Sequence, residues 1–250
     1  MKDWGKSKLK AKRKDADWVK TAKKYAALEA VKHIKDGFVV GLGSGSTAAY
    51  AIQEIGRMIH RKGWKILGVP TSHQAFLLAV DCGIPITTLN EHPRLNLTID
   101  GADQIDSELN MIKGMGGALT REKIVASSSK QNVIVADETK LVKTLGTNHP
   151  VPVEVLPFAT VSVVSKIHAL NGKTILRQRQ GKVGPIVTDN GNFILDVNFE
   201  SPIKSLHQLN TQLKLISGVI ETGFFLDMAH IAYIGGLRGV QKLERKKAKG

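Results

Sequence analysis

Residues 100–123 carry side chains that could transfer protons and bind an anion. Asp100, Asp103 and Glu122 supply carboxylates, Lys113 supplies an ammonium group, and four glycines lie between Asp100 and Glu122. A carboxylate at the end of a strand can act as a general base, and a lysine beside it can stabilise a developing oxyanion. Glycines let backbone N–H groups approach an anionic ligand closely. The alternative is that these side chains are solvated in surface loops, because burying charges without partners costs free energy.

A second loop upstream has the composition of a phosphate-binding turn. Residues 41–47 read Gly-Leu-Gly-Ser-Gly-Ser-Thr and connect an apolar run to a helical pattern. The glycines permit a tight turn, and the N–H groups and hydroxyls of Ser44, Ser46 and Thr47 would lie at the positive end of the helix dipole. The Gly-Lys-Ser/Thr ending of a nucleotide P-loop is missing, and no acidic residue is clearly placed for a dinucleotide. This second loop strengthens the catalytic interpretation of residues 100–123.

The chain alternates helical and strand patterns, which would bring the two loops to one edge of a sheet. A helical pattern through Ala27, Val31 and Ile34 ends at Gly37. After it we expect strands at 38–40, 66–69, 86–89, 97–99 and 133–136, and helices at 47–58, 72–80 and 120–128. Repeated strand–helix–strand units predict an α/β fold with a mainly parallel, doubly wound sheet covered on both faces. Ligands of such sheets bind at the carboxyl ends of the strands.

The character of the sequence changes near Gly146, after which prolines are frequent. Here we expect a helix at 161–170, strands at 174–177, 186–188 and 193–197, and a hairpin turn at 189–192. Ser201 and Pro202 would open a helix with apolar positions at Leu206, Leu209 and Leu213, and the run 230–234 would complete the sheet. We therefore predict a basic N-terminal extension at 1–24, a catalytic α/β domain at 25–145 and 222–250, and an inserted small α+β domain at 146–221.

Composition excludes several classes of protein. The chain has one cysteine, Cys82, so no disulfide can form within it, and we expect a reducing, cytoplasmic location. No apolar run approaches the roughly 20 residues of a transmembrane helix, and the histidines lack metal-ligand spacing, so neither a membrane contact nor a metal site is expected. The net charge of +14 comes mainly from residues 1–24 and 242–249. These tails could contact a polyanion weakly, but we favour a solvated extension because few aromatic residues accompany the charges.

Six blocks of sequence, taken in order, closely resemble ribose-5-phosphate isomerase of type A. They are GLGSGSTA at 41–48, DGADQID at 100–106, KGMGGALTREKIVA at 113–126, VADETKLV at 135–142, PVEVLPFA at 152–159 and VTDNGN at 187–192. The resemblance runs from about residue 20 to about residue 240. It implies interconversion of ribose 5-phosphate and ribulose 5-phosphate in the pentose phosphate pathway, without a metal or organic cofactor. It also implies self-association as a homodimer or homotetramer.

The resemblance assigns roles to individual residues. Glu122 matches the general base, which would move a proton between C1 and C2 through an enediolate. Asp100 and Asp103 match two substrate-binding aspartates of the catalytic set, and Lys113 matches the active-site lysine. The other substrate-binding positions that it implies are Ser44, Gly45, Ser46, Thr47, Gly101, Ala102, Gly114, Met115, Gly116 and Lys140. Lys113 and Lys140 could exchange the tasks of contacting the sugar and the phosphate.

The chemistry of the residues supports these roles. Removing a proton beside a carbonyl leaves negative charge on oxygen, which Lys113 and the N–H groups of residues 114–116 could stabilise. Because a glutamate near its reference pKa of about 4.3 is a weak base, we expect partial desolvation of Glu122 when substrate closes the site. Asp106 and Glu108 are expected on a loop outside the site. Two residues depart from the family's pattern: Gln104 stands where Glu is common, and Met115 interrupts a run of glycines and would resist a positive φ.

Three other functions fit part of the sequence. A non-enzymatic sugar-phosphate sensor would keep the loop at 44–47, but it would usually need a DNA-binding domain, for which residues 1–25 are too short. An amino-sugar phosphate deaminase would share the fold and carry a different acid–base set. A polyanion-binding protein would act through its basic tails and show salt-dependent binding.

Overall fold

The computed structural model describes residues 4–179, 181, 183–200 and 202–245, with side chains from residue 17 onward. Its main sheet has six strands in the order β13-β12-β6-β3-β1-β2. They are β1 (Val39–Leu42), β2 (Leu67–Pro70), β3 (Leu97–Asp100), β6 (Asn132–Asp137), β12 (Ile231–Gly236) and β13 (Gly239–Glu244). Neighbouring strands are parallel except for β12 and β13, which form an antiparallel hairpin. The prediction of an α/β fold with a mainly parallel sheet is confirmed.

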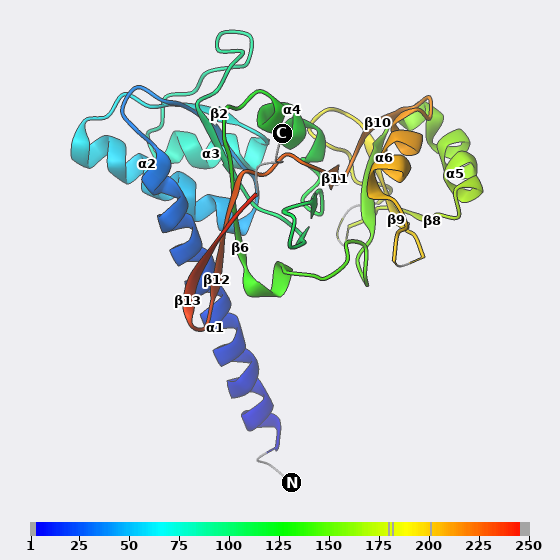
Figure 1. Cartoon of the computed structure of the whole chain (residues 1–250), viewed down its shortest axis with the longest axis horizontal. Helices are drawn as coiled ribbons and strands as arrows, with labels where there is room; N and C mark the ends of the chain where they lie inside the picture. Colours follow the sequence, from blue (N-terminus) through cyan, green and yellow to red (C-terminus); the bar gives the residue numbers. More distant parts are fainter. Residues whose placement is uncertain (1–3, 180, 182, 201, 246–250) are drawn as a thin grey trace.

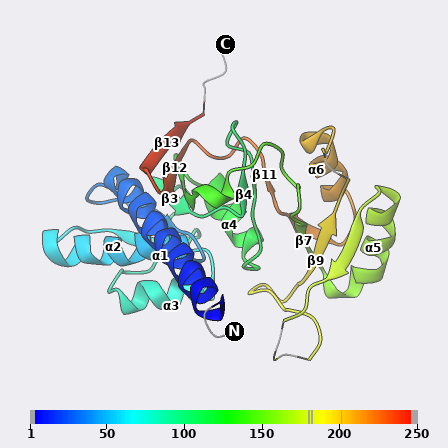
Figure 2. The same cartoon turned by 90° about the horizontal axis from the view of Figure 1, so that it is seen from below.

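Alternating side chains of the central strands divide the core into two faces. In β6, Val133 and Val135 join one apolar cluster, and Ile134 and Ala136 join another. Because successive side chains of a strand point to opposite faces, both faces need cover. The first is covered by α1 (Trp4–Ala30), α2 (Ser46–Lys62) and α3 (His73–Asp81), which Figures 1 and 2 show gathered on one side of the molecule. The second is covered by α4 (Leu119–Ser127) and a small sheet.

Two antiparallel sheets accompany the main one. The small sheet contains β4 (Gln104–Ile105), β5 (Met111–Ile112) and β11 (Phe224–Phe225). The larger has the order β10-β7-β9-β8, with β7 (Val151–Val155), β8 (Lys173–Leu176), β9 (Phe193–Asn198) and β10 (Val219–Thr222). α5 (Thr160–Ala169) and α6 (Leu206–Lys214) pack against it, at the opposite end of Figure 1 from α2. Short 3-10 helices are η1 (Val31–His33), η2 (Glu138–Lys140) and η3 (Pro157–Ala159). The predicted domain boundaries stay a prediction.

The strand order creates a switch point between β1 and β3. The chain passes from β1 to β2 on one side, and then crosses back to β3 on the other side of β1. Loops that leave the carboxyl ends of such strands diverge, and ligands of open α/β sheets bind in the crevice between them. The loop after β1 carries Ser44, and β3 ends at Asp100. Both predicted loops therefore meet at this crevice.

Three predicted elements are wrong. Residues 86–89 form only an isolated bridge at Ile86, because the Glu91 carboxylate takes the N–H and hydroxyl of Thr88 and turns the chain. Residues 186–188 form no strand and follow a single bridge at Pro185, which has no N–H to extend a ladder. The helix expected at Ser201 and Pro202 begins at Leu206, because Ser205 caps it by accepting the N–H of Gln208 at 3.3 Å. Ser201 lies outside the described residues.

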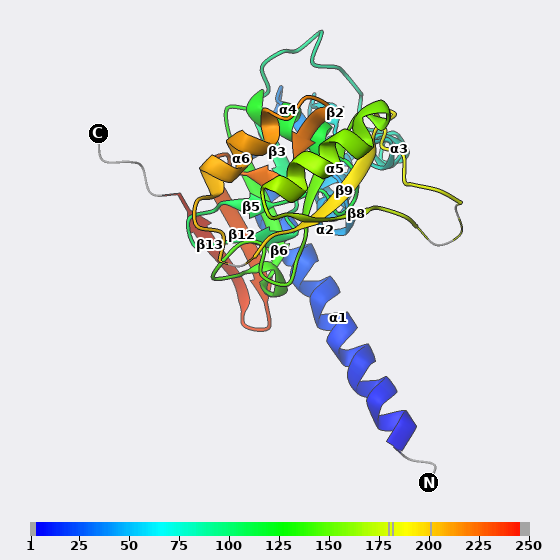
Figure 3. The ribbon, with the colours of Figure 1, turned by 90° about the vertical axis from the view of Figure 1, so that its right-hand side faces the viewer.

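The N-terminal segment differs from the expected solvated extension. α1 is a continuous helix whose first turns project from the body in Figure 3, whereas Ala22 is only 3% exposed. A Cβ atom on Gly235 of β12 would lie 2.1 Å from the Ala22 carbonyl oxygen, so α1 packs directly on the sheet. The segment that can be solvated therefore ends before Ala22. No helix in the described part of the chain is both long enough and apolar enough to cross a bilayer.

Candidate active site

The carboxyl ends of β1 and β3 approach so closely that residue 43 must be glycine. A Cβ atom on Gly43 would lie 2.3 Å from Oδ1 and 2.5 Å from Cα of Asp100. The next residue, Ser44, donates its N–H to Asp100 Oδ1 at 3.2 Å, and Gly101 donates to the same oxygen at 2.7 Å. Asp100 thereby fixes the loop after β1 to the end of β3.

Lys113 and Glu122 complete a buried charged cluster beside Asp100. The ammonium of Lys113 lies 3.1 Å from Asp100 Oδ2 and 3.3 Å from Glu122 Oε2, and it donates to the Gly101 carbonyl at 2.6 Å. Asp100, Lys113 and Glu122 are 3%, 4% and 5% exposed. Glu122 Oε2 is at ion-pair distance from the Lys113 ammonium and accepts no hydrogen bond from any other described residue. A buried acceptor of this kind is uncommon and marks a functional candidate.

Burial of the cluster, in which two carboxylates face one ammonium, shifts the pKa values of its members. Burial, and then the charge of Asp100, raise the pKa of Glu122 to about 8, although Lys113 opposes the shift. Burial likewise raises the pKa of Asp100 against the attraction of Lys113. Burial disfavours the charge of Lys113, but Asp100 and Glu122 outweigh it and raise the pKa of its ammonium. We expected substrate to desolvate Glu122; in this structure the fold itself already does so.

The glycine-rich loop after Lys113 is held from two sides. Asp103 Oδ2 accepts the N–H of Met115 at 2.9 Å, while Arg177 donates to the carbonyls of Gly114 and Met115 at 2.7 and 3.2 Å. Arg177 is itself paired with Asp196 of β9. The positive φ angles fall on Gly114 (112°) and Gly117 (78°), and Met115 is not among the residues with positive φ. Met115 therefore avoids the positive φ that a non-glycine residue would resist.

The loop after β1 forms an exposed cradle at the N-terminus of α2. Gly45 precedes the helix with φ of 93°, and its N–H donates to Gln74 Oε1 at 2.9 Å. The Ser44 hydroxyl contacts those of Thr71 and Ser72 at 2.8 and 2.5 Å. Free N–H groups in the first helical turn and the helix dipole favour an anion here. The predicted phosphate-binding geometry, a glycine turn entering a helix, is present.

An open pocket of about 210 Å³ lies between the cradle and the charged cluster. The predicted site residues that line it are Ser44, Gly45, Gly101, Asp103, Lys113, Gly114, Gly116 and Glu122. Asp100 lies behind Lys113 and does not line the pocket. Four other predicted residues stand outside its wall: Ser46, Thr47, Ala102 and Met115. Lys140 is also outside the wall, at the end of η2 after β6, on the same carboxyl edge of the sheet.

Several residues of the site were missed by the sequence analysis. Lys23 of α1 donates to the Ser46 hydroxyl at 3.0 Å, although it belongs to the segment that we expected to be solvated. Gln74 and Asp189 line the pocket, and Asp189 Oδ2 accepts the N–H of His73 at 2.8 Å. The turn around Asp189 was recognised as a hairpin signal, but nothing local to it indicates contact with α3, 116 residues away.

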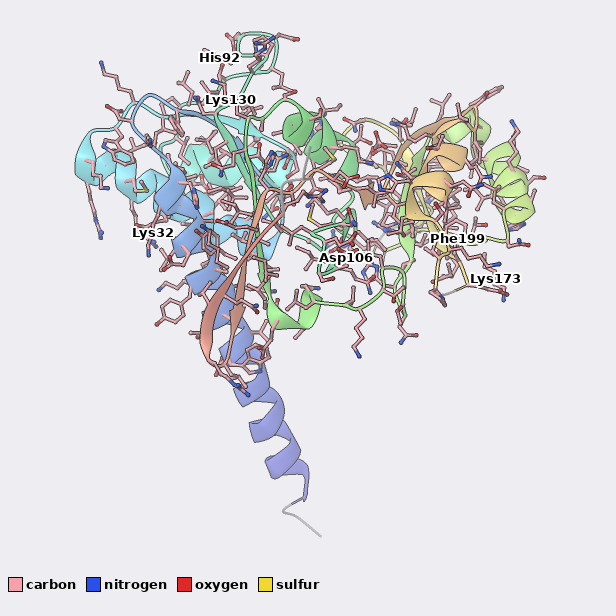
Figure 4. The ribbon with its side chains drawn as sticks, in the orientation of Figure 1. Lys32, His92, Asp106, Lys130, Lys173 and Phe199 are labelled. Atoms are coloured by element: carbon pink, nitrogen blue, oxygen red, sulfur yellow. The ribbon has the colours of Figure 1, made fainter. Side chains whose placement is uncertain are left out.

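Asp106 and Gln104 do not line the pocket. Asp106, labelled in Figure 4, accepts the N–H groups of Glu108 and Asn110 within its own turn, as expected for a loop residue. Gln104 accepts the Gly146 N–H at 2.8 Å and donates to the Thr147 carbonyl at 3.0 Å. The amide at 104 therefore joins two loops and leaves the charge of the site unchanged. In the described part of the chain, no three His, Cys, Asp or Glu side chains are grouped to hold a metal ion.

Comparisons with known proteins agree with this geometry. The family model described as ribose 5-phosphate isomerase A (phosphoriboisomerase A) matches residues 67–239. Ribose-5-phosphate isomerase A of Methanosarcina acetivorans is 52% identical over 88% of this chain and 93% of its own length.

Solved structures extend the likeness to three dimensions. A D-ribose-5-phosphate isomerase in complex with phospho-erythronic acid is 45% identical, with a TM-score of 0.88 over 91% of this chain and 99% of its own. The ribose 5-phosphate isomerase A of Methanocaldococcus jannaschii is 40% identical, with a TM-score of 0.86 over 90% of this chain and 98% of its own. Because sequence and fold agree over nearly the whole length, this chain belongs to the ribose 5-phosphate isomerase A family of isomerases.

Proposed function

We propose that this protein interconverts D-ribose 5-phosphate and D-ribulose 5-phosphate in the non-oxidative pentose phosphate pathway, with Glu122 as the general base. The observation that carries the proposal is a buried Glu122 carboxylate, 3.3 Å from Lys113 in the pocket wall, in a chain of this family. Glu122 would take the proton from one of the two carbons C1 and C2 and return it to the other, through an enediolate.

The raised pKa of Glu122 suits this task. A carboxylate with a pKa of about 8 is a far stronger base than an exposed glutamate, and it can hold a proton between the two transfer steps. Burial by the fold supplies this basicity before substrate binds. Proton transfer by a positioned side chain typically accelerates a reaction by about 10²–10⁴-fold.

Lys113 is the proposed stabiliser of the enediolate oxygens. Its ammonium is fixed by Asp100 and the Gly101 carbonyl, so little reorganisation is needed when charge develops. The N–H of Met115 is engaged by Asp103, which leaves Gly114 and Gly116 as the backbone donors of this loop for the oxyanion. Asp103, in the pocket wall, would accept a sugar hydroxyl, whereas Asp100 would act through Lys113 and Ser44.

The phosphate would bind at the cradle, which lines the same pocket as Glu122. Ser44 to Thr47 offer hydroxyls and the first N–H groups of α2, and Lys23 adds a positive charge 3.0 Å from the Ser46 hydroxyl. Lys140, on the same edge of the sheet, would supply a second cation when the substrate is bound. In this assignment Lys113 serves the reacting carbons and Lys140 the phosphate.

The ligand of the related solved structure suggests an inhibitor. Phospho-erythronic acid carries a carboxylate next to a hydroxyl-bearing carbon, and a planar carboxylate resembles an enediolate in shape and charge. An analogue of a charged intermediate binds more tightly than the substrate. We therefore expect it to compete with ribose 5-phosphate in this protein.

The proposal is tested with purified full-length protein and ribose 5-phosphate, by following ketose formation in H₂O and in D₂O. We expect turnover with deuterium incorporated at the reacting carbon, because an enediolate mechanism passes the hydrogen through an exchangeable carboxyl group.

Glu122→Gln should lower kcat by about 10³-fold while phospho-erythronic acid still binds. Glu108→Gln, an exposed glutamate on the Asp106 turn, is the matched control and should behave as wild type. No ketose from wild type would refute the function, and equal turnover by wild type and Glu122→Gln would refute the base.

Two further expectations belong to this proposal. The protein should self-associate as a homodimer or homotetramer, which light scattering on the purified chain can measure. We also expect it to work in the cytoplasm, since its single cysteine suits a reducing compartment. Weak contact of the basic tails with polyanions would appear as salt-dependent binding to nucleic acid.

A further inference from the structure

Glu154 is a buried carboxylate that the proposed reaction does not use. It lies on β7 of the four-stranded sheet and is 0% exposed. Its Oε2 accepts the hydroxyl of Thr120 at 2.5 Å. Its Oε1 accepts the hydroxyl of Thr188 at 2.8 Å and the side-chain amides of Asn190 and Asn192 at 3.1 and 2.8 Å. A buried carboxylate is retained only where donors satisfy its oxygens, so these four bonds form one connected unit.

One side of this unit is the first turn of α4. Thr120 is the second residue of α4, and the residue before the helix, Ala118, has no polar side chain to cap it. Thr120 and Glu122 are two residues apart, so they project about 200° from one another around the helix axis. Thr120 can therefore anchor the helix to the four-stranded sheet while Glu122 faces the pocket on the other side.

The opposite side of the unit is the turn at residues 188–192. This turn is closed by paired hydrogen bonds between Thr188 and Asn192. Asp189 within it lines the pocket and binds the start of α3 through the His73 N–H. Arg121 of α4 donates to the Asp189 carbonyl and to Asn190 Oδ1, each at 2.7 Å. The turn thus spans from α3 to α4 along the pocket wall.

We infer that Glu154 is a positioning residue of the active site. It fixes the first turn of α4, and with it Glu122, relative to the turn at residues 188–192, which forms part of the pocket wall. The inference rests on the proposed isomerase function. A rigid anchor matters here because a displacement of about 1 Å between a catalytic group and its target can lower a rate by about 10²-fold. Glu154, on the four-stranded sheet, would thereby hold α4 and the turn at residues 188–192, which both border the pocket, in a fixed arrangement.

Thr120→Val tests the inference, because it keeps the shape of the side chain and removes only the hydroxyl. We expect kcat to fall by about 10- to 100-fold, with KM within about threefold of wild type, since the cradle is not touched. Thr120→Ser restores the hydroxyl and should recover most of kcat. Thr160→Val is the matched control: it removes a hydroxyl that bonds the Pro157 carbonyl at the start of α5, and it should keep wild-type kinetics.

Two more variants separate the two sides of the unit. Asn192→Ala loosens the Asp189 turn, so we expect a severalfold rise in KM with kcat within about threefold. Glu154→Gln keeps an oxygen for the turn but places an amide nitrogen where Oε2 accepts the Thr120 hydroxyl, so the charge-assisted bond is lost and kcat should fall in the same direction as in Thr120→Val. Wild-type kcat in Thr120→Val, or failure of serine to restore it, would overturn the inference while the proposed function stands. An inactive wild type would overturn the proposed function itself.

Discussion

The cradle after β1 and the cluster around Lys113 face each other across one pocket, yet they differ in exposure and in charge. Gly45 and Ser46 are exposed, and the groups that the cradle offers are hydroxyls and N–H groups. The Lys113 cluster is at most 5% exposed, and all of its side chains are ionisable. A phosphate can be bound by exposed donors while it keeps part of its hydration. Proton abstraction is favoured by a carboxylate of raised pKa, and burial beside another carboxylate raises the pKa of Glu122.

The largest effect should come from removing the cation of the buried cluster. Lys113→Met leaves two buried carboxylates without their ammonium, so we expect kcat/KM to fall by about 10²–10³-fold. The free energy of unfolding should fall by about 3–5 kcal/mol, as when one partner of a buried pair is lost. This loss should be greater at pH 9 than at pH 6, because at the lower pH the carboxylates can be protonated. Steady-state kinetics and urea unfolding measure both effects.

The matched control for Lys113 is an exposed lysine. Lys130, labelled in Figure 4, is exposed beyond the end of α4. Lys130→Met should leave kcat/KM unchanged and should change the free energy of unfolding by no more than about 0.5 kcal/mol. Equal stability of Lys113→Met and wild type at pH 9 would contradict the buried ion cluster.

The pH dependence of kcat/KM should report the raised pKa of Glu122. Because Glu122, the proposed base, would have to be ionised to act and its pKa is raised to about 8, kcat/KM should rise with pH and approach a plateau only above that value. The second ionisation of the sugar phosphate, near 6, should give an earlier and separate limb. A profile that is flat between pH 7 and 9 would contradict the assignment.

The raised pKa of Glu122 also makes the free energy of unfolding depend on pH, and the sign of this dependence can be derived. Between the ordinary pKa of about 4.5 and about 8, the folded chain holds a proton at Glu122 that the unfolded chain has lost. Stability contributed by this group therefore falls as the pH rises through that window. Glu122→Gln has no such proton to lose, so its stability relative to wild type should increase from pH 5 to pH 8 in urea unfolding. No change in the difference between the two proteins would count against the raised pKa.

A smaller effect on the kinetics is expected from a substitution beside the exposed cradle. Lys23→Met removes the ammonium beside the Ser46 hydroxyl, so KM for ribose 5-phosphate should rise about tenfold while kcat changes little. The effect should shrink at high salt, because the Lys23 side chain is 21% exposed and its field is screened. Lys24→Met, at the exposed neighbouring position, is the control. A loss of kcat with unchanged KM would place Lys23 outside phosphate binding.

The smallest kinetic effect should come from Gln104. Gln104→Glu replaces the donor to the Thr147 carbonyl with an acceptor, so we expect a loss of about 1–3 kcal/mol in the free energy of unfolding. Because the side chain does not line the pocket, kcat and KM should stay within about twofold of wild type. A large change in kcat would show that charge at position 104 reaches the site.

Five strands of the main sheet were predictable because they and the helices between them have strong local patterns, whereas β13 was not predicted. Val133 to Ala136 form a continuous apolar run, and Gly37 ends a helical pattern, so both could be recognised from neighbouring residues. β7 was not predicted because Pro152 lies within it and Pro150 precedes it, and proline is normally read as a break. The small strands β4, β5 and β11 have two residues each, too few to show a period.

The composition of residues 41–47 and 100–123 indicated anion binding and proton transfer, because glycine, hydroxyl and carboxylate groups follow the predicted strands in consecutive residues, whereas the sugar-phosphate substrate was implied by the resemblance to the family. The resemblance assigned the base to Glu122, but the raised pKa that suits Glu122 to this proposed role comes from tertiary structure. Asp100, Lys113 and Glu122 arrive from β3, the end of β5 and α4, and their proton affinities depend on mutual distances and burial that no local pattern encodes. Lys23 of α1 contacts Ser46, and Glu154 of the four-stranded sheet contacts Thr120, for the same reason: packing brings together residues that are distant in the chain.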